Sequence, residues 1–199
     1  GGDGDGDGDG DGDGGDGDGD QSAVRFLVIG DTGEGNEAQY AVGAAAATIC
    51  ELKGCEFALL LGDNFYDIGV DSVTDVQFID KFEMPYADLL AAQTPFYVVL
   101  GNHDYGELAS NWELGTYQVD YGAIQPLWRM PDAGYWYDFR PRDDVHFFAF
   151  DTARIMGNED DQEYAYKLAV KHLFSTNRSR DASSNRTREG RAWRHVMSL

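Results

Sequence analysis

Short apolar runs recur along residues 24–100, and three of them end in the same way. Residues 24–29, 57–61 and 97–100 are rich in β-branched and aromatic side chains, and each run stops at a glycine that is followed by a polar residue. Apolar runs of this length predict strands that are buried in a sheet covered on both faces. These runs therefore predict the centre of an α/β fold.

Helical periodicity separates the first two strands. Asn36 and Gln39 resemble a capping box, and the alanine-rich stretch after them predicts a helix. The helix should reach about residue 52 and end at Gly54. Apolar residues recur in it at the spacing of one helix face: Val42, Ala45, Ala46 and Ile49. A strand, a helix and a strand in this order predict a parallel pair, and residues 74–84 have a second helical pattern.

The second half of the chain changes character twice. Residues 135–139 and 145–150 predict a hairpin, and residues 160–174 predict a helix with Ala165, Leu168, Ala169 and His172 on one face. Beyond residue 174 Ser, Thr, Asn and Arg dominate. We therefore expect an incomplete domain at residues 23–174 and an irregular basic tail at 175–199, which fits an artificial or alternative C-terminus.

Residues 1–22 predict a disordered tail. The first twenty are eleven Gly and nine Asp, so no apolar side chain can repay the entropy of ordering. Asp-Gly alternation begins like an EF-hand loop, but no Glu reaches the twelfth position, so specific calcium binding is not expected. The net charge of −21 argues against nucleic acid as a partner. No apolar run is long enough to predict a membrane span, and we expect a monomer.

Cys50 and Cys55 are the two cysteines of the chain. A pair with this spacing and no further Cys or His nearby is a poor zinc signal. Two buried structural thiols are the first expectation, and a local disulfide is the alternative if the protein is secreted.

The polar residues after the three strands form the candidate site. Ligands bind at the carboxyl ends of strands in open α/β sheets, so Asp31, Asp63 and the pair Asn102 and His103 should converge on one rim. Two carboxylates at one place repel each other unless a cation neutralises them. Carboxylate, amide and imidazole suit iron, manganese, zinc or magnesium, and a carboxylate can bridge two ions as in sites of phosphoester hydrolysis.

Three motifs carry a resemblance to a known family. Gly30-Asp31-Thr32-Gly33, Gly62-Asp63-Asn64-Phe65-Tyr66 and Gly101-Asn102-His103-Asp104 resemble the first three sequence blocks of the calcineurin-like metallophosphoesterases. Most members have histidine two residues after the first aspartate, where this chain has Gly33. Purple acid phosphatases of the small, tartrate-resistant type lack that histidine and use a tyrosine three residues after the second aspartate. Tyr66 has that spacing, and the resemblance covers about residues 24–174.

The resemblance implies the N-terminal portion of a four-layer α/β/β/α metallophosphoesterase sandwich. It implies a dinuclear centre of Fe(III) and a second divalent metal, which would be Fe, Zn or Mn. Asp31 and Tyr66 would bind the ferric ion, Asp63 would bridge both ions, and Asn102 would bind the second. Charge transfer from the Tyr66 phenolate to iron would colour the protein.

The implied reaction is hydrolysis of a phosphomonoester, either a small molecule or a phosphoprotein, with a metal-bound hydroxide as nucleophile. His103 would contact the phosphate or protonate the leaving group, and Asp104 would orient its ring. The resemblance also implies a secreted, lysosomal or vacuolar protein.

Three further histidine ligands of the family have no match in this chain, because neither a Gly-His-x-Pro-like nor a Gly-His-x-His segment occurs. His146 lies in a predicted strand, His172 lies on a helix face, and His195 has no preceding strand and glycine. All three are expected to be structural. The alternative function is therefore a truncated, catalytically silent fragment that acts at most as a metal-binding or interaction protein.

Overall fold

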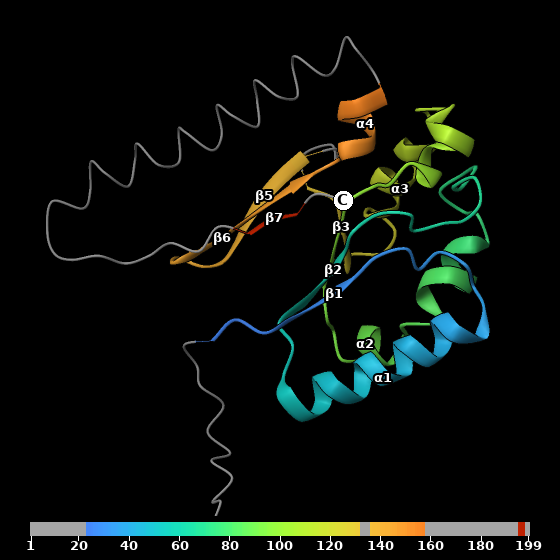
Figure 1. Cartoon of the computed structure of the whole chain (residues 1–199). Coiled ribbons are helices and arrows are strands. Elements are labelled where there is room, and N and C mark those ends of the chain that lie inside the picture. Colours follow the sequence, from blue (N-terminus) through green and yellow to red (C-terminus); the bar gives the residue numbers. More distant parts are fainter. Residues whose placement is uncertain (1–22, 132–135, 158–194, 198–199) are drawn as a thin grey trace, which may run out of the picture.

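A computed structural model describes residues 23–131, 136–157 and 195–197 (Figure 1). The expected tail at 1–22, the expected helix at 160–174 with His172, and most of the expected tail at 175–199 lie outside these ranges. The domain boundaries at residues 22 and 174 stay predictions.

The first sheet is parallel throughout. Its strands are β1 (Phe26–Ile29), β2 (Phe57–Leu60), β3 (Phe96–Val98) and β4 (Trp128–Arg129), and they pair in that order. The three strands expected from the apolar runs are therefore confirmed, as is the parallel pairing of the first two. All four strands point their carboxyl ends to the same edge, which is where the candidate residues follow.

The second sheet contains the expected hairpin. Strands β5 (Trp136–Arg142) and β6 (Val145–Phe150) are antiparallel. Strand β7 (His195–Met197) pairs parallel to β6. The expectation that residues 175–199 are irregular is wrong for these three residues, because an unpaired edge of β6 accepts a short backbone segment without requiring an apolar run.

The helices flank the parallel sheet. They are α1 (Glu37–Lys53), the π-helix η1 (Ile79–Glu83), α2 (Ala87–Ala91), the 3₁₀ turns η2 (His103–Tyr105) and η3 (Glu107–Ala109), α3 (Leu114–Tyr121) and α4 (Thr152–Gly157). Helix α1 begins as expected, with the Asn36 side chain accepting from the Gln39 amide, and ends at Gly54. The helix expected over residues 74–84 is shorter and is π-helical.

The buried face of α1 matches the expected one only at Ala46. Val42 and Ile49 are 48% and 53% exposed, whereas Gln39, Gly43 and Ala46 are buried. A Cβ at Gly43 would lie 2.0 Å from the carbonyl oxygen of Pro85. The helix therefore packs through its small residues, because the backbone at Pro85 approaches too closely for larger ones.

Two apolar cores lie on opposite faces of the parallel sheet. Alternate residues of β2 separate them: Ala58 and Leu60 contact the helix side, while Phe57 and Leu59 contact the second sheet. Phe57 packs edge-on against Phe147 at 5.3 Å between ring centroids. Figure 1 shows the resulting order of layers, with β5 and β6 on one side of β1–β3 and α1 and α2 on the other. The expected α/β fold with two stacked sheets is confirmed.

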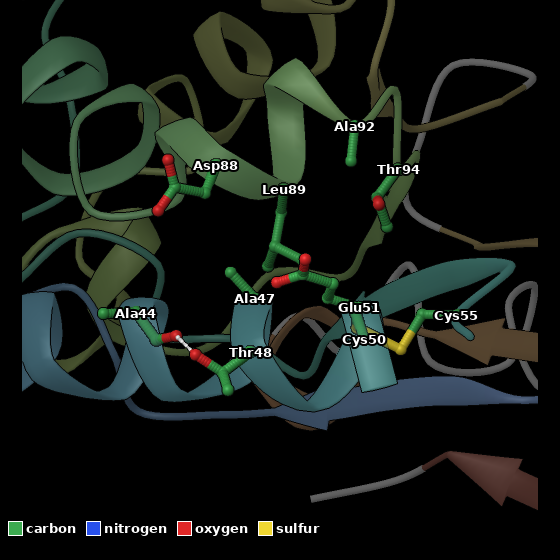
Figure 2. Close-up of a pocket in the computed structure, with 10 residues that line it drawn as sticks. All are labelled: Ala44, Ala47, Thr48, Cys50, Glu51, Cys55, Asp88, Leu89, Ala92 and Thr94. Atoms are coloured by element: carbon green, nitrogen blue, oxygen red, sulfur yellow. Dashed lines mark hydrogen bonds between the residues drawn. A yellow bond between two sulfur atoms is a disulfide. The ribbon is translucent and has the colours of Figure 1, made fainter. Parts of the chain in front are cut away.

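A disulfide joins Cys50 at the end of α1 to Cys55 before β2. The expectation of two free thiols is wrong. Gly54, whose amide bonds to the Cys50 carbonyl at 2.8 Å, turns the chain back and leaves the two Cα atoms 4.9 Å apart. The disulfide borders a pocket of about 360 Å³ between α1 and α2 (Figure 2). Its lining is Ala44, Ala47, Thr48, Cys50, Glu51, Cys55, Asp88, Leu89, Ala92 and Thr94.

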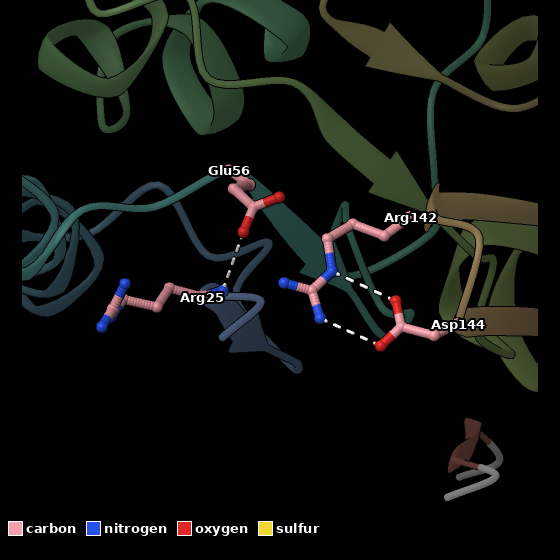
Figure 3. A network of polar contacts seen from close by, with 4 residues as sticks. All are labelled: Arg25, Glu56, Arg142 and Asp144. Carbon is pink, nitrogen blue, oxygen red and sulfur yellow. Dashed lines mark hydrogen bonds and ion pairs between the residues drawn. The ribbon is translucent and has the colours of Figure 1, made fainter. Parts of the chain in front are cut away.

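Exposed polar contacts join residues next to the strands (Figure 3). The Arg25 amide donates to Glu56 Oε1 at 3.2 Å, which joins the residues that precede β1 and β2. Arg142 forms a two-pronged ion pair with Asp144 across the turn between β5 and β6. Exposed pairs of this kind contribute at most about 1 kcal/mol each.

In the part of the chain that the structure describes, no helix is both long and apolar enough to cross a membrane.

We predict that the free energy of unfolding of the double variant Cys50→Ser/Cys55→Ser is about 2 kcal/mol lower than that of the wild type, because the disulfide restricts a short loop of the unfolded chain. Urea unfolding followed by circular dichroism measures this difference. A thiol reductant should lower the stability of the wild type to that of the variant and leave the variant unchanged. Equal stabilities under oxidising conditions would contradict the prediction.

Candidate metal centre

Asp31 and Asp63 follow β1 and β2 in the same unusual backbone conformation. Their φ angles are 54° and 51°, in the left-handed region that side chains other than glycine seldom adopt. The Asp31 amide donates to the Gly62 carbonyl at 3.2 Å, which joins the two turns. These two turns bring Asp31 and Asp63 to one rim, as expected.

The Tyr66 hydroxyl lies between the two carboxylates. It is 2.8 Å from Asp31 Oδ1 and 2.9 Å from Asp63 Oδ2. Partial burial, these hydrogen bonds and the charges of both carboxylates raise the pKa of Tyr66 well above its ordinary value. Three oxygen atoms thus surround one position, and the single phenolic proton is shared between the two carboxylates.

The other oxygen of Asp63 faces His103. Asp63 Oδ1 accepts from the His103 amide at 2.9 Å. The ring of His103 bonds through Nδ1 to the Asp67 carbonyl at 2.7 Å and lies 4.6 Å from the Tyr66 ring. Because a carbonyl oxygen can only accept, Nδ1 carries the proton and Nε2 is the ring nitrogen left for another partner. His103 is therefore held in one tautomer at the edge of the carboxylate pair.

Asp104 does not orient the His103 ring, as the resemblance implied, because its carboxylate is 0% exposed and fully engaged elsewhere. It accepts from the amides of Asn64, Phe65 and Gly101 and from the side chains of Asn64 and Gln118. Burial raises the pKa of Asp104 to about 6, although these donors oppose the rise. Asp104 joins the turn after β2 to the turn after β3.

Asn102 is exposed and starts the turn that continues into η2. Among the hydrogen bonds of the described residues, none joins its side chain to Asp31, Asp63 or Tyr66. The structure therefore brings together two carboxylates, a phenol and an imidazole, and leaves Asn102 beside them.

Glycine at position 33 is required by a close approach of two backbones. A Cβ there would lie 2.4 Å from backbone atoms of Asn64 and Phe65. The Gly33 amide donates to the Asp63 carbonyl at 3.1 Å, and the Tyr66 amide donates to the Gly33 carbonyl at 2.9 Å. A histidine side chain therefore has no room at this position, and the side chain that reaches Asp31 from the turn after β2 is that of Tyr66.

Asp151, at the end of β6, is a supporting residue that the sequence did not single out. It is buried, accepts from the Tyr105 hydroxyl and caps α4 by accepting from the Arg154 amide at 2.8 Å. Burial raises the pKa of Asp151 to about 7. Its only signal in the sequence is its position directly after a strand. Through Tyr105 it connects the second sheet to the turn that carries His103.

Within residues 23–131 and 136–157, the histidines are His103 and His146. His146 lies in β6, where its Nε2 contacts Asp138, and His195 begins β7. Among residues 23–131, 136–157 and 195–197, no group of three or more His, Cys, Asp and Glu side chains could hold a metal ion. The candidate centre consists of the two carboxylates together with the Tyr66 phenol.

The chain is similar to proteins of a known family. The family model described as calcineurin-like phosphoesterase matches residues 24–186. Human tartrate-resistant acid phosphatase type 5 is 33% identical over 149 residues, which are 70% of this chain and 44% of the relative. The pig protein of the same name is 34% identical over 69% of this chain and 42% of its own length. Purple acid phosphatase 3 of Arabidopsis thaliana is 45% identical over 41% of this chain and 22% of its own length.

A solved structure shares the fold. GAP50, the anchor in the inner membrane complex of Plasmodium, superposes with a TM-score of 0.54 at 23% identity, over 72% of this chain and 47% of that one. The chain spans less than half the length of the curated relatives that it matches.

We predict that Gly33→Ala lowers the free energy of unfolding by about 1–3 kcal/mol, because the new Cβ must displace the backbone at Asn64 and Phe65. Chemical denaturation measures the change. Gly54→Ala is the matched control: its φ of 77° strains an alanine, but no atom lies within 4 Å of the new Cβ. A loss at Gly33 no larger than the loss at Gly54 would contradict the steric argument.

The raised pKa of Asp151 predicts a pH dependence of stability. Between about pH 4 and pH 7 the folded chain holds a proton on this carboxyl that the unfolded chain has released. The contribution of the Asp151 carboxyl to the free energy of unfolding is therefore present at low pH. It falls by up to about 1.4 kcal/mol per pH unit as the pH rises. Asp151→Asn removes the titration, so the stability of the variant relative to the wild type should rise over this range. A difference that stays constant from pH 4 to pH 7 would refute the assignment.

Proposed function

Because the chain belongs to the calcineurin-like phosphoesterase family and resembles its purple acid phosphatases, we propose that the protein hydrolyses phosphomonoesters at a dinuclear metal centre. The observation that carries this proposal is the Tyr66 hydroxyl placed within 2.9 Å of both Asp31 and Asp63. Two turns at this edge can form without a phenol between their carboxylates, so the position of Tyr66 points to a function beyond the fold.

The donor set fits the proposed ions. Two carboxylates and a phenol are hard oxygen ligands, which suit Fe(III), and Asp31 and Tyr66 would hold it. Asp63 presents one oxygen toward Tyr66 and the other toward His103, which suits a carboxylate that bridges two ions. Asn102 would contribute its amide oxygen to the second, divalent ion, which would be Fe, Zn or Mn. When bound, the two cations would neutralise the phosphate and lower the pKa of a water that attacks it.

His103 would act on the substrate. Its Nδ1–H is engaged by the Asp67 carbonyl, so in the imidazolium form the Nε2–H would donate to a phosphate oxygen or give its proton to the leaving group. Asp104 would serve by holding the turns of Asp63 and His103 together. The substrate would be a small phosphomonoester or a phosphoprotein. The disulfide between Cys50 and Cys55 supports a secreted, lysosomal or vacuolar setting, since such bonds persist in oxidising compartments.

A catalytically silent role is the second candidate, and one observation favours it. Among the residues that the structure describes, no group of three or more His, Cys, Asp and Glu side chains could hold a metal ion. In that case the chain would bind one metal ion or act as an interaction protein.

We predict that the purified chain loaded with Fe(III) shows a visible phenolate-to-iron absorption band, and that Tyr66→Phe abolishes it. Tyr117→Phe, which alters a tyrosine at the edge of the apolar core, should retain the band. Persistence of the band in Tyr66→Phe would remove Tyr66 from the ligand set.

Hydrolysis of p-nitrophenyl phosphate separates the two candidate functions. With iron and zinc supplied, slow hydrolysis that falls about 100-fold or more in Asp63→Asn supports the phosphatase. An iron-phenolate band without any hydrolysis in the wild-type chain supports the silent role.

A further inference from the structure

The turns that carry Asp31 and Tyr66 are joined at a second place, away from the carboxylates. Lys81, in the π-helix η1, donates through its ammonium to the backbone carbonyl of Tyr66. The Lys81 carbonyl accepts from Gln39 Nε2 at 2.7 Å, and Gln39 Oε1 accepts from the Gly35 amide at 2.6 Å. These bonds run from the Tyr66 turn through η1 to the segment between Asp31 and α1.

Pro85 explains why η1 can make these bonds. Proline has no N–H, so the Lys81 carbonyl cannot accept the α-helical bond from residue 85. The Met84 amide bonds instead to Ile79, and the Tyr86 amide bonds to Phe82. The wide π-turn thus leaves the carbonyls of Asp80 and Lys81 without helical partners, and the Tyr40 hydroxyl and Gln39 side chain of α1 take them.

The stem of Lys81 fills the space beside Gly35. A Cβ at Gly35 would lie 3.0 Å from Lys81 Cγ, and Gly35 has a φ of 69°. The half-buried side chain is therefore packed along the segment that follows Asp31 before its ammonium reaches Tyr66. Because its stem is packed in this way, the Lys81 ammonium is held more firmly than the ammonium of an exposed lysine.

We infer that Lys81 is a positioning residue, which holds the Tyr66 turn so that the phenol stays on Asp31 and Asp63. That Lys81 holds the turn is independent of the proposed function. The consequence, ligation of a metal ion by Tyr66, rests on the proposed function. Lys81 contacts the backbone of Tyr66 and neither carboxylate, so its effect on the centre passes through the turn.

Amide hydrogen exchange of the metal-free chain tests the position directly. Lys81→Met should speed exchange in the peptide 62–69 by about tenfold, because a charge-assisted hydrogen bond that restrains local opening is lost. Lys53→Met, which alters an exposed lysine in the last turn of α1, should leave this peptide unchanged. Lys81→Arg, which keeps a donor of the same charge, should restore at least half of the protection. Equal exchange in Lys81→Met and Lys53→Met overturns the inference.

The phenolate-to-iron band of the Fe(III)-loaded chain gives a second readout. Lys81→Met should weaken the band per bound iron about twofold or more, and Lys81→Arg should recover it. Faster exchange with an unchanged band would overturn the positioning role and leave Lys81 as a structural contact. If the wild-type chain shows no band, the proposed ferric site fails, and the exchange of the metal-free chain still decides whether Lys81 holds the turn.

Discussion

The fully buried carboxylate of Asp104 is the interaction on which the candidate centre depends. Burying a charge is costly unless donors replace water, and three backbone amides and two side-chain amides do so here. The backbone donors come from the turn after β2 and the turn after β3. Separating these turns would remove the Asn64 and Phe65 donors from a carboxylate that stays buried, so this bonding holds the turns of Asp63 and His103 together.

Steric exclusion at Gly33 explains which side chains meet at this rim. The backbone of Asn64 and Phe65 occupies the space that a side chain at position 33 would need, and hydrogen bonds on both sides of Gly33 fix that approach. Position 33 therefore contributes no side chain to the rim, whereas Asp31 does. The same approach brings Tyr66 over the two carboxylates. The lack of a side chain at position 33 and the position of Tyr66 therefore both follow from one backbone contact.

The parts of the fold that the sequence predicted are those set by apolarity alone. Continuous apolar runs identify buried strands, and their common glycine endings located Asp31 and Asp63 on one rim. Apolarity does not predict how closely two backbones approach. The buried face of α1 was mispredicted because periodicity weighs Val42 and Ile49 above Gly43, whereas the approach of Pro85 selects the smallest residue. The disulfide, the π-helix and the role of Asp104 depend on turn geometry, which residue spacing does not specify.

Fold and chemistry have separate support in this chain, since the shared fold extends to an anchor protein of low identity. The chemistry is supported by two costs that coincide at the rim. Asp31 and Asp63 both adopt left-handed φ angles, and their carboxylates share one phenol at distances below 3 Å. Glycine would relieve the backbone strain, and asparagine would relieve the repulsion between like charges. A turn that served only the fold would need neither cost, and a cation placed between these oxygens would remove the repulsion that the left-handed turns create by bringing the two carboxylates together.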